Sequence, residues 1–354
     1  MKRLHTIILT FAVLLTSACN SSSDIDEIVG ENDALCLETT AILGAESSAA
    51  KTTRAHWDDK NGNKFVWDDS SNEMAIFVKE SPTGNLVPWG AAKYSKAKVA
   101  RLADMHGKSM ASIVSNSGML KTDIQKLVVD QSPVYFFSPI ISGAEGNVSS
   151  ISDDGVTLAL PSDFLQPASH SLTDFKKYTY IMAESTISQV NNARIEAKPA
   201  VFKGIPAVIR FSVTNDRGSE VKIKSIKVTP KTPDGFPQNM NDGFPQNMKW
   251  NHGSPGTLTP SDDKHPSLTA SMEGDGDALG VKESKNYYVF LFPTSFTSAT
   301  LTITASINGS EFTYKCEVPA KTFESNKIYT WKLTIGDQSL KLGFHENEDD
   351  LIQW

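Results

Sequence analysis

Short apolar runs separated by turn-forming residues repeat along most of the chain from residue 57 onward. β-Branched and aromatic side chains dominate these runs, while Gly, Pro, Asn and Ser cluster between them. Many such runs in succession are typical of β-sandwiches. The sequence therefore predicts an all-β fold. The predicted strands include residues 64–67, 73–78, 133–140, 156–161, 178–183, 207–213, 221–228, 287–293, 299–307, 311–318 and 328–335.

One stretch in the first half has a different spacing. Val99, Leu102, Met105 and Ile113 recur at loosely helical intervals within residues 95–128. Apolar residues three or four positions apart share one face of a helix. We expect one short helix in this stretch.

A second stretch, from about residue 229 to 286, is rich in Pro, Gly, Asp and Asn and poor in strand formers. It contains the heptapeptide DGFPQNM twice, at 234–240 and 242–248. The functional interpretation is a duplicated binding loop with exposed aromatic side chains. The alternative is a duplication that a surface loop tolerates. The aromatic residues in question are Phe236, Phe244 and Trp250.

The N-terminus has the pattern of an export signal. Lys2 and Arg3 precede an apolar run at residues 7–15, which is shorter than the roughly 20 apolar residues that span a bilayer. The small residues Ser17 and Ala18 follow it. The predicted signal peptide covers residues 1–18.

Cys19 follows these small residues directly, as in a bacterial lipobox, where the cysteine becomes the lipidated first residue. The leucine usual three positions before the cysteine is displaced by one, because Thr16 holds that position and Leu15 precedes it. The alternative is ordinary cleavage near Ala18. We expect lipidation of Cys19.

Composition narrows the function further. The apolar content of 39% suffices for buried cores, and the length fits two domains. A net charge of −7 argues against nucleic acid as a partner, because phosphate binding needs a basic face. The other two cysteines, Cys36 and Cys316, either pair in an oxidising compartment or remain separate buried thiols.

Motifs for catalysis, phosphate binding and metal binding are absent from the sequence. Asp275 and Asp277 form a loose calcium-like pair, but Asn286 stands where an EF-hand loop needs glutamate. We therefore expect no enzyme activity, no catalytic residue, no cofactor and no metal.

The segment that follows Cys19 has the composition of a flexible tether. Residues 20–33 are polar and acidic, and a short apolar segment follows around residues 35–43. Small and polar residues then flank Arg54 on its N-terminal side, which is typical of an exposed loop where proteolysis concentrates.

The order of several segments carries a family resemblance. Each motif alone is common, but together they extend over 300 residues. They are the lipoprotein signal, TRA at 53–55 followed by an aromatic strand, YFFSP at 135–139, LALP at 158–161 with Gln166 nearby, FKGIPAVIRFSV at 202–213, and FLFP at 290–293 followed by Lys327, Tyr329 and Thr330.

This order resembles the fimbrillin family, the type V pilins that include Mfa-like and fimbrillin-like lipoproteins. Two departures stand out. EMAIF, at 73–77, replaces the common GD-x-I-G-V-F, and Gly204 stands where histidine is common. The resemblance implies two β-sandwich domains of transthyretin-like topology, at residues 55–192 and 193–354.

The resemblance also implies a maturation pathway. The chain would reach the outer membrane as a lipoprotein through Cys19. An arginine-specific protease would then cut between Arg54 and Ala55. Residues 19–54, which hold the lipidated propeptide and first strand, would be discarded, and a strand from the next subunit would fill the groove left behind.

The tail at residues 337–354 contains a candidate donor strand. Leu340, Leu342 and Phe344 alternate with Lys341 and Gly343, so that one face is apolar. The alternative is that residues 339–345 form the last strand of their own domain.

The sequence thus favours a pilus subunit or pilus-associated surface lipoprotein whose partners are other pilin subunits. It names no host or bacterial receptor. The alternative function is a monomeric surface glycan-binding lipoprotein of a nutrient-uptake system. That function would require a planar row of exposed aromatic side chains and an uncut N-terminus.

Overall fold

The computed structural model confirms the all-β fold. Two short helical segments interrupt the strands of the described chain, α1 (Lys121–Ile124) and the 3₁₀ helix η2 (Leu172–Tyr178). The residues that the structure describes are 34–43, 56–58, 64–66, 74–102, 109–138, 150–191, 193–231, 243–251, 257–337, 339–344 and 349–350.

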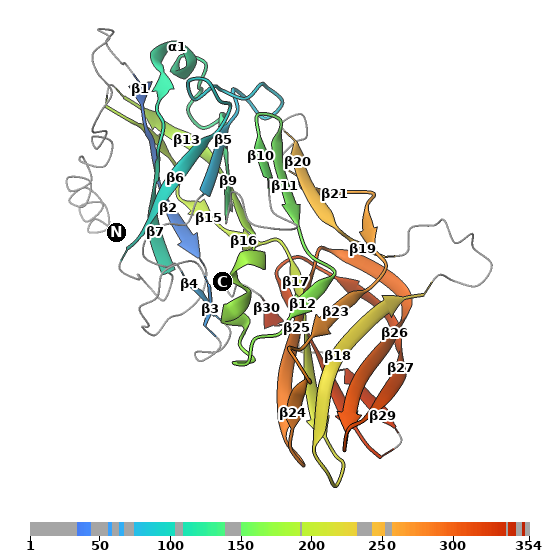
Figure 1. Ribbon diagram of the computed structural model, residues 1–354. Helices are drawn as coiled ribbons and strands as arrows, with labels where there is room; N and C mark the ends of the chain where they lie inside the picture. The colour runs from blue at the N-terminus through green and yellow to red at the C-terminus, as the bar shows by residue number, and fades with distance from the viewer. Residues whose placement is uncertain are drawn as a thin grey trace, which may run out of the picture.

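One large sheet, the N-terminal sheet, dominates the first half of the chain (Figure 1). Within the described residues its nine strands follow the order β14–β13–β9–β5–β6–β7–β2–β15, with β16 beside β13. Because β14 also pairs with β2, the sheet closes on itself. Its strands are β2 (Leu37–Leu43), β5 (Met74–Val78), β6 (Ser95–Arg101), β7 (Ser109–Ser115), β9 (Pro133–Ser138), β13 (Ile181–Val190), β14 (Ile195–Ala197), β15 (Ala200–Val201) and β16 (Lys203–Gly204).

Two small strand pairs accompany this sheet. β1 (Ala34–Leu35) pairs with β8 (Met119–Leu120), and β3 (His56–Asp58) pairs with β4 (Lys64–Val66). The domain boundary predicted after residue 192 falls between β13 and β14, which both belong to the N-terminal sheet. The division into domains stays a prediction.

Two sheets of the second half face each other. The first has the order β12–β23–β18–β26–β27 with β24 beside β18, and the second has the order β25–β17–β28–β29 with β30 beside β28. The rings of Phe323 on β27 and Trp331 on β28 lie 6.3 Å apart across the two sheets. The strands are β12 (Asp163–Leu165), β17 (Ala207–Asn215), β18 (Val221–Pro230), β23 (Leu268–Ser271), β24 (Asp277–Leu279), β25 (Ser284–Leu291), β26 (Thr294–Ile307), β27 (Ser310–Phe323), β28 (Lys327–Ile335), β29 (Leu340–Phe344) and β30 (Asp349–Asp350).

The alternation along β18 shows how sequence sets the buried face. Val221, Ile223, Ile226 and Val228 are all fully buried, although their spacing is broken by one residue. The structure places a register shift in the pairing with β26 between Ile223 and Ser225. A bulge there returns the next apolar residues to the same face.

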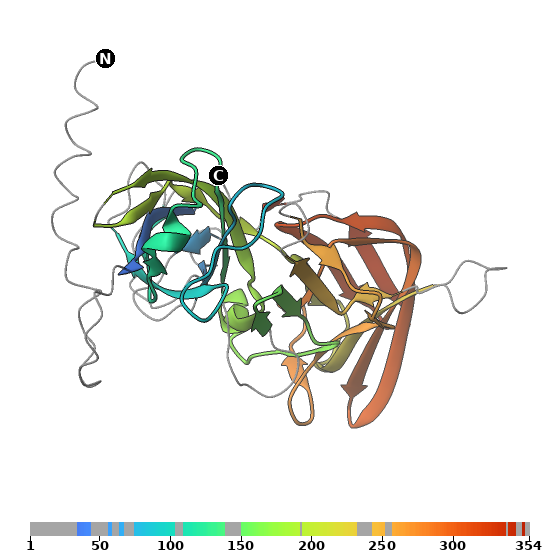
Figure 2. The ribbon, with the colours of Figure 1, turned by 90° about the horizontal axis from the view of Figure 1, so that it is seen from above.

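A four-stranded sheet joins the two halves, as Figures 1 and 2 show. Trp250 on β20 is fully buried against Phe77 of β5 and against Tyr135 and Phe137 of β9. A side chain from the second half thus completes the aromatic core of the first. The strands are β10 (Ser150–Ser152), β11 (Gly155–Ala159), β20 (Asn247–Asn251) and β21 (Thr259–Pro260); nearby, β19 (Phe244–Pro245) pairs with β22 (Lys264–His265).

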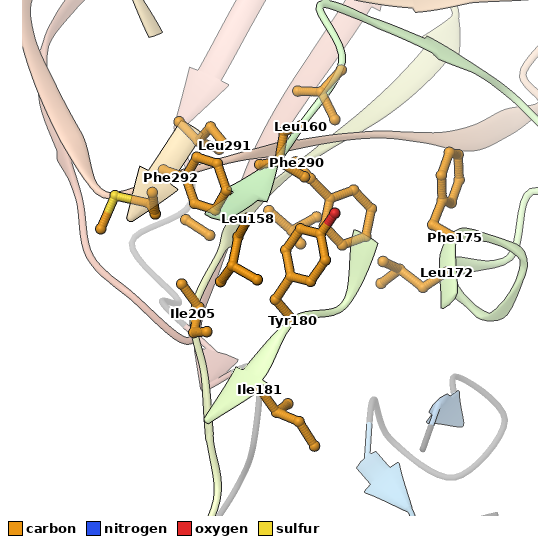
Figure 3. Close-up of a cluster of buried hydrophobic side chains, with 14 of the residues drawn as sticks. Leu158, Leu160, Leu172, Phe175, Tyr180, Ile181, Ile205, Phe290, Leu291 and Phe292 are labelled. Atoms are coloured by element: carbon orange, nitrogen blue, oxygen red, sulfur yellow. The ribbon is translucent and has the colours of Figure 1, made fainter. Parts of the chain in front are cut away.

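A second apolar cluster lies between β11, the end of η2 and the end of β25 (Figure 3). Tyr180 stacks on Phe292 with ring centroids 6.3 Å apart, and its hydroxyl donates to the carbonyl oxygen of Ala159 at 2.7 Å. Burial raises the pKa of this hydroxyl. Through this cluster the two halves of the chain share one continuous core.

The expected helix in residues 95–128 is mostly wrong. Val99 and Ile113 lie in the strands β6 and β7, and the helix there is the single turn α1. Alternate residues of β6, including Ala97 and Val99, are buried, so its period is that of a strand. Pairing with β5 and β7 overrides the weak strand propensity of Ala, Ser and Lys.

The interpretation of residues 229–286 as a loop with exposed aromatics is also wrong where the structure describes it. Phe244, in the second copy of the repeat, is 1% exposed, and Trp250 is fully buried. Phe236, in the first copy, lies outside the described residues. The second copy is therefore part of the folded core.

Candidate functional site

Strand β2 occupies the position at which the N-terminal sheet closes. It pairs antiparallel with β7 from Glu38, opposite Val114, to Leu43, opposite Ser109. On its other side it pairs in parallel with β14 and β15. Figure 1 shows β2 between β7 and β15. Without β2, a groove one strand wide would open between β7 and the pair β14 and β15.

From Leu37 to Ala41, every second side chain of β2 points inward, toward the core. Leu37 and Ala41 are fully buried, and Thr39 between them is 7% exposed. Glu38 and Thr40 point the other way and are half-buried. The groove beneath β2 therefore has room for a large apolar residue, a hydroxyl residue and a small residue, in that order.

A break in the parallel ladder faces Thr39. β14 ends at Ala197 and β15 begins at Ala200, and Pro199 between them has no N–H to donate. The Thr39 hydroxyl donates to the carbonyl oxygen of Lys198 at 2.8 Å and lies 3.2 Å from that of Ala197. A side chain thus supplies hydrogen bonds where the ladder is interrupted.

Two polar contacts lie at the N-terminal end of β2. The backbone N–H of Leu37 donates to Ser115 Oγ at 2.9 Å. A Glu38 carboxylate oxygen lies 3.3 Å from the Arg194 guanidinium, with both side chains about a quarter exposed. At that exposure the ion pair helps to orient the strand and adds little stability.

Strand β1 extends the same contact toward α1. Ala34 and Leu35 pair with Leu120 and Met119 of β8. At Gly118, a Cβ atom would come within 2.9 Å of the Ala34 side chain, so glycine permits this close approach. Residues 34–43 are thus built into the first half of the fold along their whole length.

The side chain of Gln166 makes a separate polar contact with β25, an edge strand of its sheet. The Gln166 side chain is 7% exposed, and its amide nitrogen donates to the carbonyl oxygens of Phe164 and Tyr288 at 2.7 and 2.9 Å. Its amide oxygen accepts the N–H of Tyr288 at 2.8 Å. The carboxamide therefore bonds both backbone groups of Tyr288, as a neighbouring strand would.

Replacing Gln166 by leucine is expected to lower the free energy of unfolding by roughly 2–4 kcal/mol, because two backbone groups of Tyr288 lose a buried partner. Urea unfolding measures this. Gln131→Leu, at an exposed position, is the control and should change stability by less than about 0.5 kcal/mol. Equal stability of the two variants would show that Gln166 is not needed to cover β25.

Asp277 belongs to a cluster of polar side chains. Its carboxylate accepts from the Tyr287 hydroxyl at 2.6 Å and from Lys285 at 3.0 Å, and lies 3.2 Å from His170 Nε2. Burial by itself raises the pKa of Asp277, but the bonds from Tyr287 and Lys285 outweigh it and hold the pKa below its usual range. Asp275 is exposed, and no cluster of three potential metal ligands occurs among the described residues.

Cys36 and Cys316 are not joined by a disulfide in the described structure. Both are half-buried, one on the N-terminal side of β2 and the other in β27. Burial raises the pKa of the Cys316 thiol to about 11, which keeps it protonated at neutral pH. The structure therefore agrees with the second alternative from the sequence, in which the two thiols are separate.

A protein-family model described as fimbrillin-like matches residues 170–346, which is half of the chain. The chain belongs to the fimbrillin-like family. The match runs from η2 to β29, so it includes the last strands of the N-terminal sheet, from β13 on, as well as β25. The resemblance expected from the order of motifs is confirmed.

Several solved structures are similar to this fimbrillin-like chain. A candidate cell adhesion protein from Bacteroides uniformis shares 11% identity at a TM-score of 0.48, covering 91% of this chain and 100% of its own. A fimbrial protein from Bacteroides vulgatus shares 11% identity at a TM-score of 0.41, covering 85% and 99%. A fimbrial assembly protein from Parabacteroides distasonis shares 11% identity at a TM-score of 0.41, covering 89% and 98%. No curated protein matches the sequence.

The predicted processing residues of the fimbrillin-like chain, Cys19, Arg54 and Ala55, lie outside the described residues. Arg54 nevertheless has a defined place in the chain order, since residues 44–55 connect β2 to β3. A cut after Arg54 would leave β1 and β2 on the discarded side. Processing stays a prediction.

The predicted donor residues Leu340, Leu342 and Phe344 lie in β29, the last strand in the order of its sheet. They stand opposite Ile335, Leu333 and Trp331 of β28. Leu342 is half-buried against the core. The tail thus pairs within its own chain in this structure, as the alternative had it, and its role as a donor stays a prediction.

A planar row of aromatics, which the glycan-binding alternative requires, is not found among the described side chains. Phe312 is the one exposed aromatic residue there, at 42% exposure. No described helix is long and apolar enough to cross a membrane.

Thr39 was not among the predicted functional residues, although the sequence around it is informative. LETTAIL, at 37–43, alternates Leu, Thr and Ala, and Pro199 marks a place where a ladder stops. Nothing in the sequence alone indicates that these two features meet. Gln166 was noticed as a motif residue, but not as the residue that covers β25.

Proposed function

We propose that this fimbrillin-like protein is a pilus subunit or pilus-associated surface lipoprotein with a structural and adhesive role. It is assembled by strand exchange after its N-terminal segment is removed. The observation that carries the proposal is the place of β2, which completes the N-terminal sheet yet lies before Arg54 in the chain. One cut can therefore convert a complete sheet into an acceptor.

The pathway begins with export through the signal peptide at residues 1–18 and acylation of Cys19, which holds the precursor at the outer membrane. The cut between Arg54 and Ala55 then separates the lipid from the folded protein. In this scheme the lipid is a temporary tether, and the released subunit is held at the surface by its neighbours in the fimbrium.

Physical chemistry supports the exchange. Loss of β2 leaves unpaired N–H and C=O groups on β7 and on β14 and β15, beside the pockets of Leu37 and Ala41. Such an edge favours the addition of a strand. The tail, with Leu340, Leu342 and Phe344, is the candidate donor toward the next subunit. A contact of this head-to-tail kind does not close, so it builds filaments.

The experiment that tests the proposal is Arg54→Lys in the producing cell, followed by gel electrophoresis of surface material without heating. We expect the variant to stay as a lipid-bearing precursor and to lose its high-molecular-weight ladder, because an arginine-specific protease does not cut after lysine. Arg101→Lys, in β6, is the control and should keep the ladder. An unchanged ladder in Arg54→Lys would contradict the proposal.

A further inference from the structure

The groove beneath β2 makes a chemical demand that this chain's own tail does not meet. The geometry points to a donor strand from a different protein, with a hydroxyl residue at the position of Thr39, a small residue two positions later and an acidic residue just before. The inference rests on the proposed function, because it concerns the occupant of the groove that processing opens.

The hydroxyl requirement comes from the gap at Pro199. The carbonyl oxygens of Ala197 and Lys198 face β2 there, and the Thr39 hydroxyl reaches both of them, at 3.2 and 2.8 Å. Ser185 Oγ donates to the Lys198 carbonyl as well, at 2.7 Å, whereas among the described residues Thr39 is the side chain that contacts the Ala197 carbonyl. An incoming strand with an apolar residue at this point buries these carbonyls with fewer partners, which is costly.

The space at Ala41 and the charge of Arg194 restrict the sequence of the donor strand further. Ala41 is fully buried opposite Ala111 of β7, which is also fully buried, so a bulky residue in its place would overpack the site. Glu38, one position before the hydroxyl, faces Arg194 at 3.3 Å. A lysine there would repel the guanidinium.

The tail fails these demands in the matching register. With Leu340 at the position of Leu37, Lys341 faces Arg194, Leu342 replaces the hydroxyl and Phe344 enters the site of Ala41. Shifting by two residues in either direction still places Leu340 or Phe344 at the position of Thr39. Shifting so that Ser339 replaces Thr39 places Lys341 in the buried site of Ala41. No such register of the tail joins a hydroxyl to a small apolar neighbour.

The consequence is that the groove and the tail of this chain belong to two different contacts. The groove takes a strand from another subunit type, and the tail is kept for its own sheet or for a different acceptor. A polymer of this chain alone is disfavoured, which places the protein at a junction between unlike subunits.

A peptide-exchange experiment on the full chain tests this. Residues 48–54 are replaced by the recognition sequence of a site-specific protease, so that cleavage leaves β1 and β2 in place but no longer covalently held. Fluorescein-labelled peptides then compete for the groove, and anisotropy reports their binding. The probes are residues 34–45 with Cys36→Ser, the same peptide carrying Thr39→Val, Thr39→Ser or Ala41→Phe, and the tail peptide 336–347.

We expect the 34–45 peptide to enter the groove. Thr39→Val, which keeps the shape and loses the hydroxyl, should bind about tenfold more weakly, while Thr39→Ser should lose less than about threefold. Ala41→Phe and the tail peptide should each bind at least about a hundredfold more weakly. Binding of the tail peptide as tight as that of 34–45, or equal binding of the Thr39→Val peptide, would overturn the inference while leaving strand exchange intact. Failure of the 34–45 peptide itself to enter would overturn the proposed function and the inference together.

Discussion

Trp250→Ala is expected to lower the free energy of unfolding by about 3–5 kcal/mol, the range for removal of a large buried aromatic side chain. Trp250 is fully buried, with its ring centroid 4.9–5.2 Å from those of Phe77, Tyr135 and Phe137. Its indole N–H has no hydrogen-bond partner in the described structure, so the loss is one of packing. Urea unfolding followed by fluorescence measures the change.

The same substitution should uncouple the two halves. Trp250 comes from β20 of the second half and fills the core of the first, so its removal leaves the first half with a cavity at the joint. We expect one cooperative transition to become two, seen by fluorescence and circular dichroism at different urea concentrations. Phe312→Ala, at an exposed position, is the control. A loss below about 1 kcal/mol would contradict the role given to Trp250.

A disulfide that ties β2 to β7 is expected to abolish assembly without preventing cleavage. Thr40 and Ser112 are directly opposite each other in the antiparallel pair. Opposite residues have Cα atoms about 4.5–5.5 Å apart, within the range that a disulfide spans. Cysteines at both positions, in a Cys36→Ser, Cys316→Ser background, should hold β2 in its groove after the cut following Arg54. Surface material should then lack polymers until a reductant is added.

The matched control places the same kind of crosslink away from the groove. Lys222 and Ser306 are opposite each other in β18 and β26 of the second half. Cysteines there should leave assembly unchanged with or without reductant. Polymers of the Thr40 and Ser112 variant under oxidising conditions would show that β2 does not need to leave.

The strands of this protein were predictable where apolar character is concentrated. MAIFV of β5 and PVYFFS of β9 are buried at every position, and such runs are read as strands because both faces are covered. β6 and β7 were not predictable in this way, since Ala and Ser, with Lys in β6, are frequent in them and the pairing partners decide their conformation. The short strands between residues 229 and 286 are likewise held by long-range contacts, as Trp250 shows.

The candidate site could be predicted only in outline. Its position in the chain follows from the motif order around Arg54, and the alternation of the tail is visible in the sequence. The hydroxyl demand could not be foreseen, because it depends on a contact between Thr39 and Lys198, 159 residues apart. The pairing of β29 with β28 could not be foreseen either, since an alternating apolar segment suits its own sheet and a neighbour's groove equally.

The most direct test of the central claim, that β2 leaves with the N-terminal segment, is the N-terminal sequence of the protein sheared from the cell surface. We expect a chain that begins at Ala55, free of lipid and of residues 34–43. A chain that begins at an acylated Cys19 would contradict this expectation, because β2 would then still close the N-terminal sheet.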